Sequence, residues 1–250
     1  TVQADGSYSV DVVTPLADGT YTATATASDS AGNTANAQDP GSVDTLAPVL
    51  TVSAPDNTTD NTPTLTGTTD LPAGSTVSIV VTDSAGNSQT LTATVQADGS
   101  YSVDVVTPLA DGPYTADATA TDAAGNSASA QDPGSVDTTP PVLTVSAPDN
   151  TNDTTPTITG TTDLPAGSVI TLTVTDSAGN EQTLTAVVQE GGTYSVDVPT
   201  PLADGPYTAT ATASDPSGNT ATASDPGSIN TNAPSLTVSA PDNTSDTTPT

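Results

Sequence analysis

The chain has 250 residues, among them no Lys, Arg, His, Cys, Met, Phe or Trp, and its formal net charge is −29. This composition excludes thiolate, imidazole and Schiff-base chemistry, together with metal sites that need Cys or His. Nucleic acid and anionic membrane surfaces are excluded as partners, because binding to either depends on Lys and Arg.

Carboxylates and hydroxyls are the reactive groups that remain. Paired carboxylates hydrolyse glycosides only where one of them has a raised pKa beside a sugar cleft, and such clefts are lined by aromatic residues, which make up 2% of this chain. We therefore expect a protein that is not an enzyme. There is also no apolar run of about eighteen residues and no leader-like start, so we expect an internal segment without membrane insertion.

A Thr-, Ser-, Asp- and Ala-rich chain of this kind could be a disordered acidic linker, but a long internal repeat argues against that. Residues 1–19 recur letter for letter at 94–112, and Tyr8, Tyr101 and Tyr194 keep the same spacing, since 101 − 8 and 194 − 101 both give 93. A period of this length is that of a small autonomous domain rather than of a solenoid repeat. The sequence predicts beads on a string.

The domain boundaries are expected at Val43–Pro48 and Val136–Pro141, where proline stops a strand ladder. In chain order this gives the C-terminal half of a repeat at 1–45, complete repeats at 46–138 and 139–231, and the start of a further repeat at 232–250. Only the two complete repeats contain every segment needed to close a sandwich.

Within 46–138, short segments of alternating apolar and polar residues are separated by turn residues every eight to twelve positions, which is typical of an antiparallel sandwich. The inward residues predict seven strands, A to G, and therefore an all-β, immunoglobulin-like fold, with an irregular last strand. They are Leu50 and Val52; Leu65; Val77, Ile79 and Val81; Leu91, Ala93 and Val95; Tyr101, Val103 and Val105; Tyr114, Ala116, Ala118 and Ala120; Ala128, Ala130 and Val136.

Tyr114 follows the segment Leu109–Pro113 at the start of the sixth predicted strand. We expect a buried ring whose hydroxyl bonds back to that preceding loop, as in a tyrosine corner. The core as a whole is thin, because alanine contributes little apolar area, and this predicts marginal intrinsic stability.

Aspartates are concentrated in the loops. Because strands of a sandwich alternate in direction, linker residue Asp44 and the loop residues Asp70 and Asp122 should converge at one end of the first complete repeat. Asp137, Asp163 and Asp215 are their counterparts in the second. Asp18, Asp111 and Asp204 occupy loops that should face each junction from the opposite side, making it an acidic cup.

Hard cations such as Ca²⁺ take six to eight oxygen ligands and need neither His nor Cys. The sequence therefore predicts structural Ca²⁺ at the junctions, where it would screen repulsion and stiffen the linkers. Ordinary turn formation by Asp and Asn before Gly is the alternative. Asp83 and Asp176 begin a motif similar to that of Asp122, at the other end of the repeat. They are expected either to form turns or to belong to the next junction.

Several motifs occur in a fixed order in the second complete repeat: Asp-Thr-Thr-Pro-Pro at 137–141, Thr-Pro-Thr-Ile-Thr-Gly at 155–160, Thr-Asp-Ser-Ala-Gly-Asn at 175–180 and Leu-Ala-Asp-Gly-Pro-Tyr at 202–207. Together they resemble the bacterial Ig-like repeats of giant biofilm-associated and repeats-in-toxin-type surface adhesins. The resemblance covers the whole chain and implies an immunoglobulin-like sandwich.

The same resemblance implies an extracellular, calcium-stiffened stalk that projects a distal adhesive domain from a bacterial surface in adhesion or biofilm formation. Its metal would be carried by Asp44, Asp122, Asp137 and Asp215. The third linker departs from the pattern, since Asn230 replaces Asp there, and that junction is expected to bind Ca²⁺ more weakly.

Two other functions compete with the stalk. The repeats could be subunits of an extracellular filament that associate laterally through Thr- and Ser-rich edge strands. They could also be ligand-binding adhesive modules, although such sites usually need exposed aromatic side chains. For the stalk, the expected partners are the neighbouring repeats, with any host or surface receptor bound by domains outside these residues.

Overall fold

The computed structural model describes residues 1–240 and 247, in which all regular secondary structure is β-strand. Contacts divide the chain into two units, residues 1–136 and 137–250. No helix in the described part is long and apolar enough to cross a membrane.

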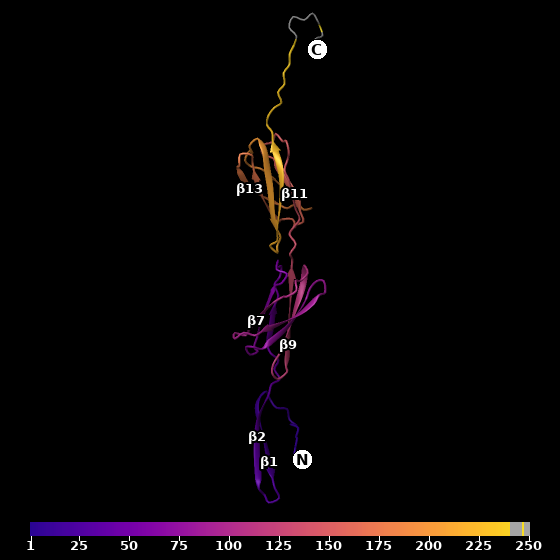
Figure 1. The fold of residues 1–250 in the computed structure, drawn as a ribbon, viewed down its shortest axis with the longest axis vertical. Helices are drawn as coiled ribbons and strands as arrows, with labels where there is room; N and C mark the ends of the chain where they lie inside the picture. Colours follow the sequence, from indigo (N-terminus) through magenta and orange to yellow (C-terminus); the bar gives the residue numbers. More distant parts are fainter. Residues whose placement is uncertain (241–246, 248–250) are drawn as a thin grey trace. The chain divides into compact units, whose positions relative to one another are not determined.

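Residues 50–136 form a sandwich of two antiparallel sheets (Figure 1). One sheet has the order β3–β4–β7 and the other the order β6–β5–β8–β9. The strands are β3 (Leu50–Ser53), β4 (Thr64–Thr69), β5 (Thr76–Thr82), β6 (Ser88–Thr94), β7 (Ser100–Asp104), β8 (Gly112–Thr121) and β9 (Ser127–Val136). The predicted seven-stranded immunoglobulin-like sandwich is confirmed.

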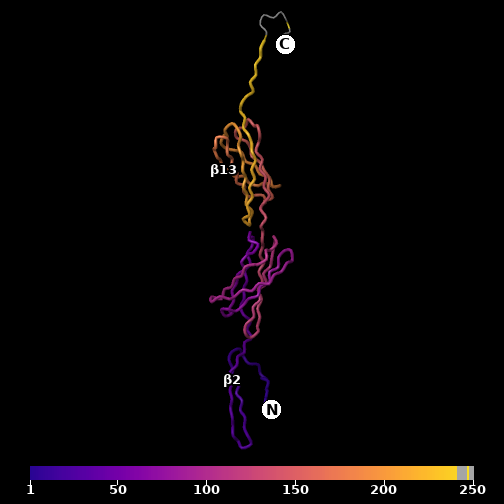
Figure 2. The backbone as a smooth tube through the Cα atoms, viewed as in Figure 1, coloured from indigo at the N-terminus to yellow at the C-terminus, as the bar shows by residue number. Residues whose placement is uncertain are grey.

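The second unit contains the same sandwich, with sheet orders β10–β11–β14 and β13–β12–β15–β16. Its strands are β10 (Leu143–Ser146), β11 (Thr157–Thr162), β12 (Val169–Thr175), β13 (Glu181–Val187), β14 (Thr193–Asp197), β15 (Gly205–Ser214) and β16 (Thr220–Ile229). Residues 230–240 continue without a strand (Figure 2). The rest of the predicted further repeat, 241–246 and 248–250, lies outside the described residues.

Residues 1–45 contain one hairpin, β1 (Gly19–Ser28) paired with β2 (Thr34–Val43). By the 93-residue period they match β8 and β9.

The cores follow the predicted alternation. On β5, Val77, Ile79 and Val81 are each 0% exposed, whereas Val80 between them is 37% exposed. β-Branched side chains at every second position favour an extended backbone with one face covered. The predicted irregular last strand is wrong, because β9 pairs with β8 continuously from Ser127 to Val136.

Both tyrosines of each complete repeat cross over a glycine on the neighbouring strand. Tyr101 on β7 lies directly opposite Gly67 on β4, and Tyr114 on β8 lies directly opposite Gly134 on β9. A Cβ atom on either glycine would lie under 3.0 Å from the tyrosine ring. The missing side chain therefore lets each ring lie across the sheet toward the first strand of the repeat.

The predicted tyrosine corner is wrong in its partner, although Tyr114 is buried as expected. Its hydroxyl donates to the carbonyl oxygen of Pro55 at 3.0 Å, and not to the loop that precedes it. The reason is Gly134, which opens a path across β9 to the segment after β3. Burial raises the pKa of Tyr114 to about 12.

Candidate functional site

Each complete repeat contains two turns with the pattern Asp-x-x-Gly-Asn, one at each end. In the β8–β9 turn, Asp122 Oδ1 accepts the backbone N–H groups of Ala124 at 2.9 Å and Asn126 at 2.8 Å. Gly125 has a φ of +95°, a left-handed conformation that glycine adopts without strain. The side-chain hydrogen bond from Asn126 is the main cause that lowers the pKa of Asp122.

The amide of Asn126 connects this turn to the preceding linker. Its Nδ2 atom donates to Asp122 Oδ2 at 2.9 Å and to the backbone carbonyl oxygen of Asp44 at 3.1 Å. Sequence reasoning selected the two aspartates but not the asparagine between them. Its recurrence at the end of every such turn was the signal that could have identified it.

The linker is fastened a second time by the loop after β4. Asp70 Oδ1 accepts the backbone N–H of Val49 at 2.8 Å, and Asp163 Oδ1 accepts that of Val142 at 2.9 Å. Both carboxylates therefore bind the residue that comes just before the first strand of their repeat. The predicted loops do meet the linker, and they meet it through hydrogen bonds.

The second unit repeats the arrangement with one additional bond. Asn219 Nδ2 donates to the carbonyl oxygen of Asp137 at 2.8 Å and to Asp215 Oδ2 at 2.9 Å. Ser217, which replaces Ala124 in this copy, donates its hydroxyl to Asp137 Oδ2 at 3.0 Å. The linker aspartate thus contacts the turn through both its backbone and its side chain.

The loops before β1 and β15 contact the linker that follows their own hairpin. Asp18 accepts the hydroxyl of Thr45 at 3.0 and 3.1 Å, and Asp204 accepts that of Thr231 at 2.8 and 2.9 Å. In the corresponding loop before β8, the backbone carbonyl of Asp111 accepts the hydroxyl of Ser84 at 2.8 Å. The threonines are further linker residues that sequence reasoning missed.

The predicted convergence of three carboxylates at one end of a repeat is not seen. In the described part of the chain, no three acidic side chains form a group that could hold a metal ion. Asp44, Asp70 and Asp122 instead meet separate partners on the linker and in the turn. Each carboxylate accepts hydrogen bonds from its own backbone N–H groups, and the sequence pattern does not reveal which N–H groups these are.

The third linker has an uncharged residue, Asn230, at the position of the linker aspartate, so it shows what the side chain does without its charge. Asp44 Oδ1 accepts the backbone N–H of Leu46 at 3.1 Å, and Asn230 Oδ1 accepts that of Asn232 at 3.2 Å. An Asn therefore preserves the local turn that the linker aspartate forms. What it does not preserve is the negative charge.

Asp83 and Asp176 belong to turns that are tied to a loop of the same repeat. Asp83 is 7% exposed, accepts the Asn87 amide at 3.0 Å, and also accepts the backbone N–H of Ala110 at 3.3 Å. Asp176 makes the same bonds with Asn180 and Ala203. The hydrogen bond from the asparagine side chain is the main cause that lowers the pKa of each aspartate.

This arrangement predicts an acid-sensitive part of the stability. A lowered pKa in the folded state stabilises the fold above the unfolded-state pKa of about 3.9, and the contribution is lost as the pH falls from about 5 through the folded pKa. Protonation of the remaining carboxylates opposes this loss by relieving repulsion. We expect a double variant, Asp83→Asn with Asp176→Asn, to lose less thermal stability than the wild type between pH 6 and pH 3.

Differential scanning calorimetry across that pH range measures the difference. Exposed Glu190→Gln serves as the control that removes a carboxylate elsewhere in the second repeat. If the double variant and the wild type had parallel pH profiles, Asp83 and Asp176 would not be the source of the acid sensitivity.

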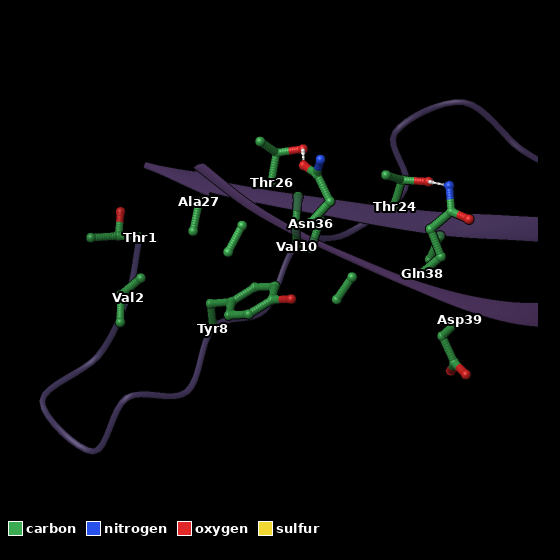
Figure 3. Close-up of a pocket in the computed structure, with 14 residues that line it drawn as sticks. Thr1, Val2, Tyr8, Val10, Thr24, Thr26, Ala27, Asn36, Gln38 and Asp39 are labelled. Atoms are coloured by element: carbon green, nitrogen blue, oxygen red, sulfur yellow. Dashed lines mark hydrogen bonds between the residues drawn. The ribbon is translucent and has the colours of Figure 1, made fainter. Parts of the chain in front are cut away.

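A hollow of about 620 Å³ lies along the inner face of the β1–β2 hairpin. Figure 3 shows Ala27 of the hairpin together with Tyr8 and Val10 of the segment that precedes it, and Tyr8 is 59% exposed. The residues one period later, Tyr101, Val103 and Ala120, are core residues of the complete sandwich. The hollow is therefore the uncovered half of a core rather than a ligand site.

The sequence comparison decides the family. The family described as "Bacterial Ig-like domain" matches residues 1–45, 51–138 and 144–231. The chain belongs to this bacterial Ig-like family. Each of the three matched segments is one Ig-like repeat or part of one, and the two complete sandwiches coincide with the second and third segments except that β3 and β10 each begin one residue earlier. No curated protein matches the chain significantly.

Solved structures of adhesins are similar to this chain. A tetra-tandem repeat in the extending region of a large adhesion protein is 41% identical, with 92% of this chain and 62% of that one covered and a TM-score of 0.38. A Ca²⁺-stabilized adhesin with which an Antarctic bacterium binds ice is 29% identical, with 84% and 55% covered and a TM-score of 0.41. A 1.5-MDa bacterial ice-binding adhesin is 24% identical, with 86% and 76% covered and a TM-score of 0.41.

The chain thus spans less than two thirds of the length of the first of these structures. The family match shows that the chain consists of bacterial Ig-like repeats.

Proposed function

We propose that these repeats are a spacer in the stalk of a large bacterial surface adhesin, outside the cell, and that they hold a distal adhesive domain away from its anchor. The observation that carries the proposal is the fastening of the linkers. In both units the linker aspartate and the residue before the first strand are bonded to loops of the following repeat. A spacer needs linkers of defined geometry, whereas independent binding modules do not.

Calcium at the linkers is the second part of the proposal. The carbonyl oxygen of Asp44 and the carboxylate of Asp122 both point at one donor, the Asn126 amide, and Asp137, Asp215 and Asn219 repeat this pattern. Carbonyl, carboxylate and amide oxygens are the ligands that Ca²⁺ prefers. These residues would hold the ion after the asparagine amide rotates, because its oxygen would then replace its nitrogen.

A bound Ca²⁺ would neutralise negative charge at a chain that has no cationic side chains, and it would restrict the linker. Extracellular modules bind Ca²⁺ at about 10⁻⁴ to 10⁻³ M, so the sites would be filled outside a cell and empty in a chelator. Binding to the folded state alone would also raise the melting temperature.

Small-angle X-ray scattering of the 250-residue chain tests both parts, with Ca²⁺ at about 1 mM and then with excess chelator. We expect chelation to reduce the maximum dimension and to lower the Tm. The variant Asp44→Asn with Asp137→Asn should remove this response while keeping the local turns, as Asn230 does at the third linker.

The control variant is Glu181→Gln with Glu190→Gln, which also removes two negative charges, at exposed positions that take part in none of the linker hydrogen bonds described above. It should keep the full response to Ca²⁺. An identical maximum dimension and Tm with Ca²⁺ and with chelator would refute the calcium proposal. A compact average shape in both conditions would refute the spacer itself.

A further inference from the structure

In each complete repeat the first and last segments of the chain lie side by side and run in the same direction. After β3 the chain leaves its sheet, and residues 54–58 follow the outer edge of β9 in the opposite sheet. The bridge between Thr58 and Val136 is parallel, as is the one between Thr151 and Ile229 in the second repeat. We call the contact of residues 54–58 with 132–136, and that of 147–151 with 225–229, the terminal clamp.

Backbone and side-chain hydrogen bonds both contribute to the terminal clamp. In the first repeat they are Ala54 N to Asp132 Oδ2 at 2.8 Å, Ser135 N to Pro55 O at 3.1 Å, Asn57 N to Ser135 Oγ at 2.8 Å, Thr58 N to Ser135 O at 3.0 Å, and Tyr114 Oη to Pro55 O at 3.0 Å. The second repeat makes the same five bonds at 2.8 to 3.2 Å through Asp225, Ser228 and Tyr207.

The sequence of β9 explains why side chains are needed. Pro133 has no N–H to donate to a neighbouring strand, and Gly134 has no side chain. Asp132 and Ser135, which flank these two residues, supply side-chain acceptors to residues 54 and 57. Tyr114 crosses over Gly134 to reach Pro55. These three side chains, from Asp132, Ser135 and Tyr114, thus supplement a strand edge that could not pair through its backbone alone.

The position of the terminal clamp matters when the chain is pulled from its two ends. Tension enters a repeat through the linker before β3 and leaves it after the last residue of β9. Because the two clamped segments are parallel, these points lie at opposite ends of their contact. All bonds between the segments then bear the tension together, whereas bonds of an antiparallel hairpin pulled at its open end break one after another.

We propose that the terminal clamp is the force-resisting element of each repeat, and that Asp132, Ser135 and Tyr114, with Asp225, Ser228 and Tyr207, set its strength. The inference rests on the proposed stalk function, since a stalk is the part of an adhesin through which tension passes. It assigns to these side chains a role that folding stability alone does not require.

Force-clamp spectroscopy of the 250-residue chain, with chelator present, tests the assignment. The variant Tyr114→Phe with Tyr207→Phe removes one clamp hydrogen bond per repeat. Because forced unfolding is governed by the unfolding rate, we expect unfolding at constant force to be roughly fivefold faster, the factor that corresponds to one hydrogen bond.

Tyr101→Phe with Tyr194→Phe is the matched control. The Tyr101 hydroxyl donates to the backbone carbonyl of Thr51, and the Tyr194 hydroxyl donates to that of Thr144. Both bonds lie within one sheet, β3–β4–β7 or β10–β11–β14, and are not part of the terminal clamp. The loss of these hydroxyls should lower stability in chemical denaturation about as much as the loss of the clamp hydroxyls. It should leave the unfolding rate under force unchanged.

Equal acceleration by both tyrosine pairs, or by neither, would overturn the proposal. Ser135→Ala with Ser228→Ala is a second clamp variant. It should also unfold faster at constant force, and an unchanged unfolding rate would contradict the proposal. The scattering experiment on the linkers can fail while this contrast holds, because the terminal clamp includes none of the linker aspartates. Failure of the spacer and failure of the clamp are therefore distinguishable.

Discussion

Gly67→Ala is expected to lower the stability of the first complete repeat by about 3 kcal/mol, because no space exists for a methyl group. A Cβ atom there would lie under 3.0 Å from the carbonyl oxygen of Thr51 and from the ring of Tyr101. The ring would have to move, and with it the hydroxyl that binds Thr51. Differential scanning calorimetry should show a decrease in Tm of roughly 15 °C for this repeat.

The second repeat provides an internal reference, since its own glycine, Gly160, is unchanged and its transition should stay in place. Gly74→Ala is the matched control, because Gly74 has a φ of +89° but no atom within 4 Å of the added Cβ. The Gly74→Ala variant tests the effect of backbone strain without a steric clash between the added methyl group and a neighbouring residue. A smaller loss for Gly67→Ala than for Gly74→Ala would contradict the close approach of the tyrosine ring.

The second large effect is expected for Ile79→Ala at the centre of the first core. Ile79 is 0% exposed, so truncation leaves a cavity and should cost about 2 to 5 kcal/mol in the free energy of unfolding. In a core this poor in large side chains, that is a large part of a typical domain stability of about 5 to 15 kcal/mol. Urea denaturation followed by circular dichroism measures it.

The neighbouring substitution Val80→Ala is the control, because Val80 is 37% exposed and points away from the core. It should change the free energy of unfolding by less than about 1 kcal/mol. Equal losses at the two positions would show that the alternation of inward and outward residues on β5 is wrong.

The edges of the sheets bear on the alternative of a laterally associated filament. The outer edge of β9 is occupied by residues 54–58 of the same repeat, and Pro133 interrupts its row of donors. This edge is therefore not free to pair with a second chain. The contact that covers this edge, between residues 54–58 and 132–136, is the terminal clamp.

The sequence by itself determined the repeat length, the strand pattern and most of the core. Identical spacing of Tyr8, Tyr101 and Tyr194 gave the period, and alternation at Val77, Ile79 and Val81 gave the inward face of a strand. Both features are local in the chain, because a strand has a fixed two-residue period and a repeat copies its own pattern. The Asp-rich loops could be placed near the linkers because successive strands of a sandwich alternate in direction.

The tertiary structure alone decided which groups those loops and rings meet. Tyr114 binds Pro55, which lies 59 residues away in sequence, and Asn126 binds the backbone of Asp44, 82 residues away. The aspartates that were expected to converge each bind separate N–H groups instead. Such partners depend on how two sheets pack and where a glycine leaves a gap, and a residue pattern along one strand contains no information about the strand that crosses it.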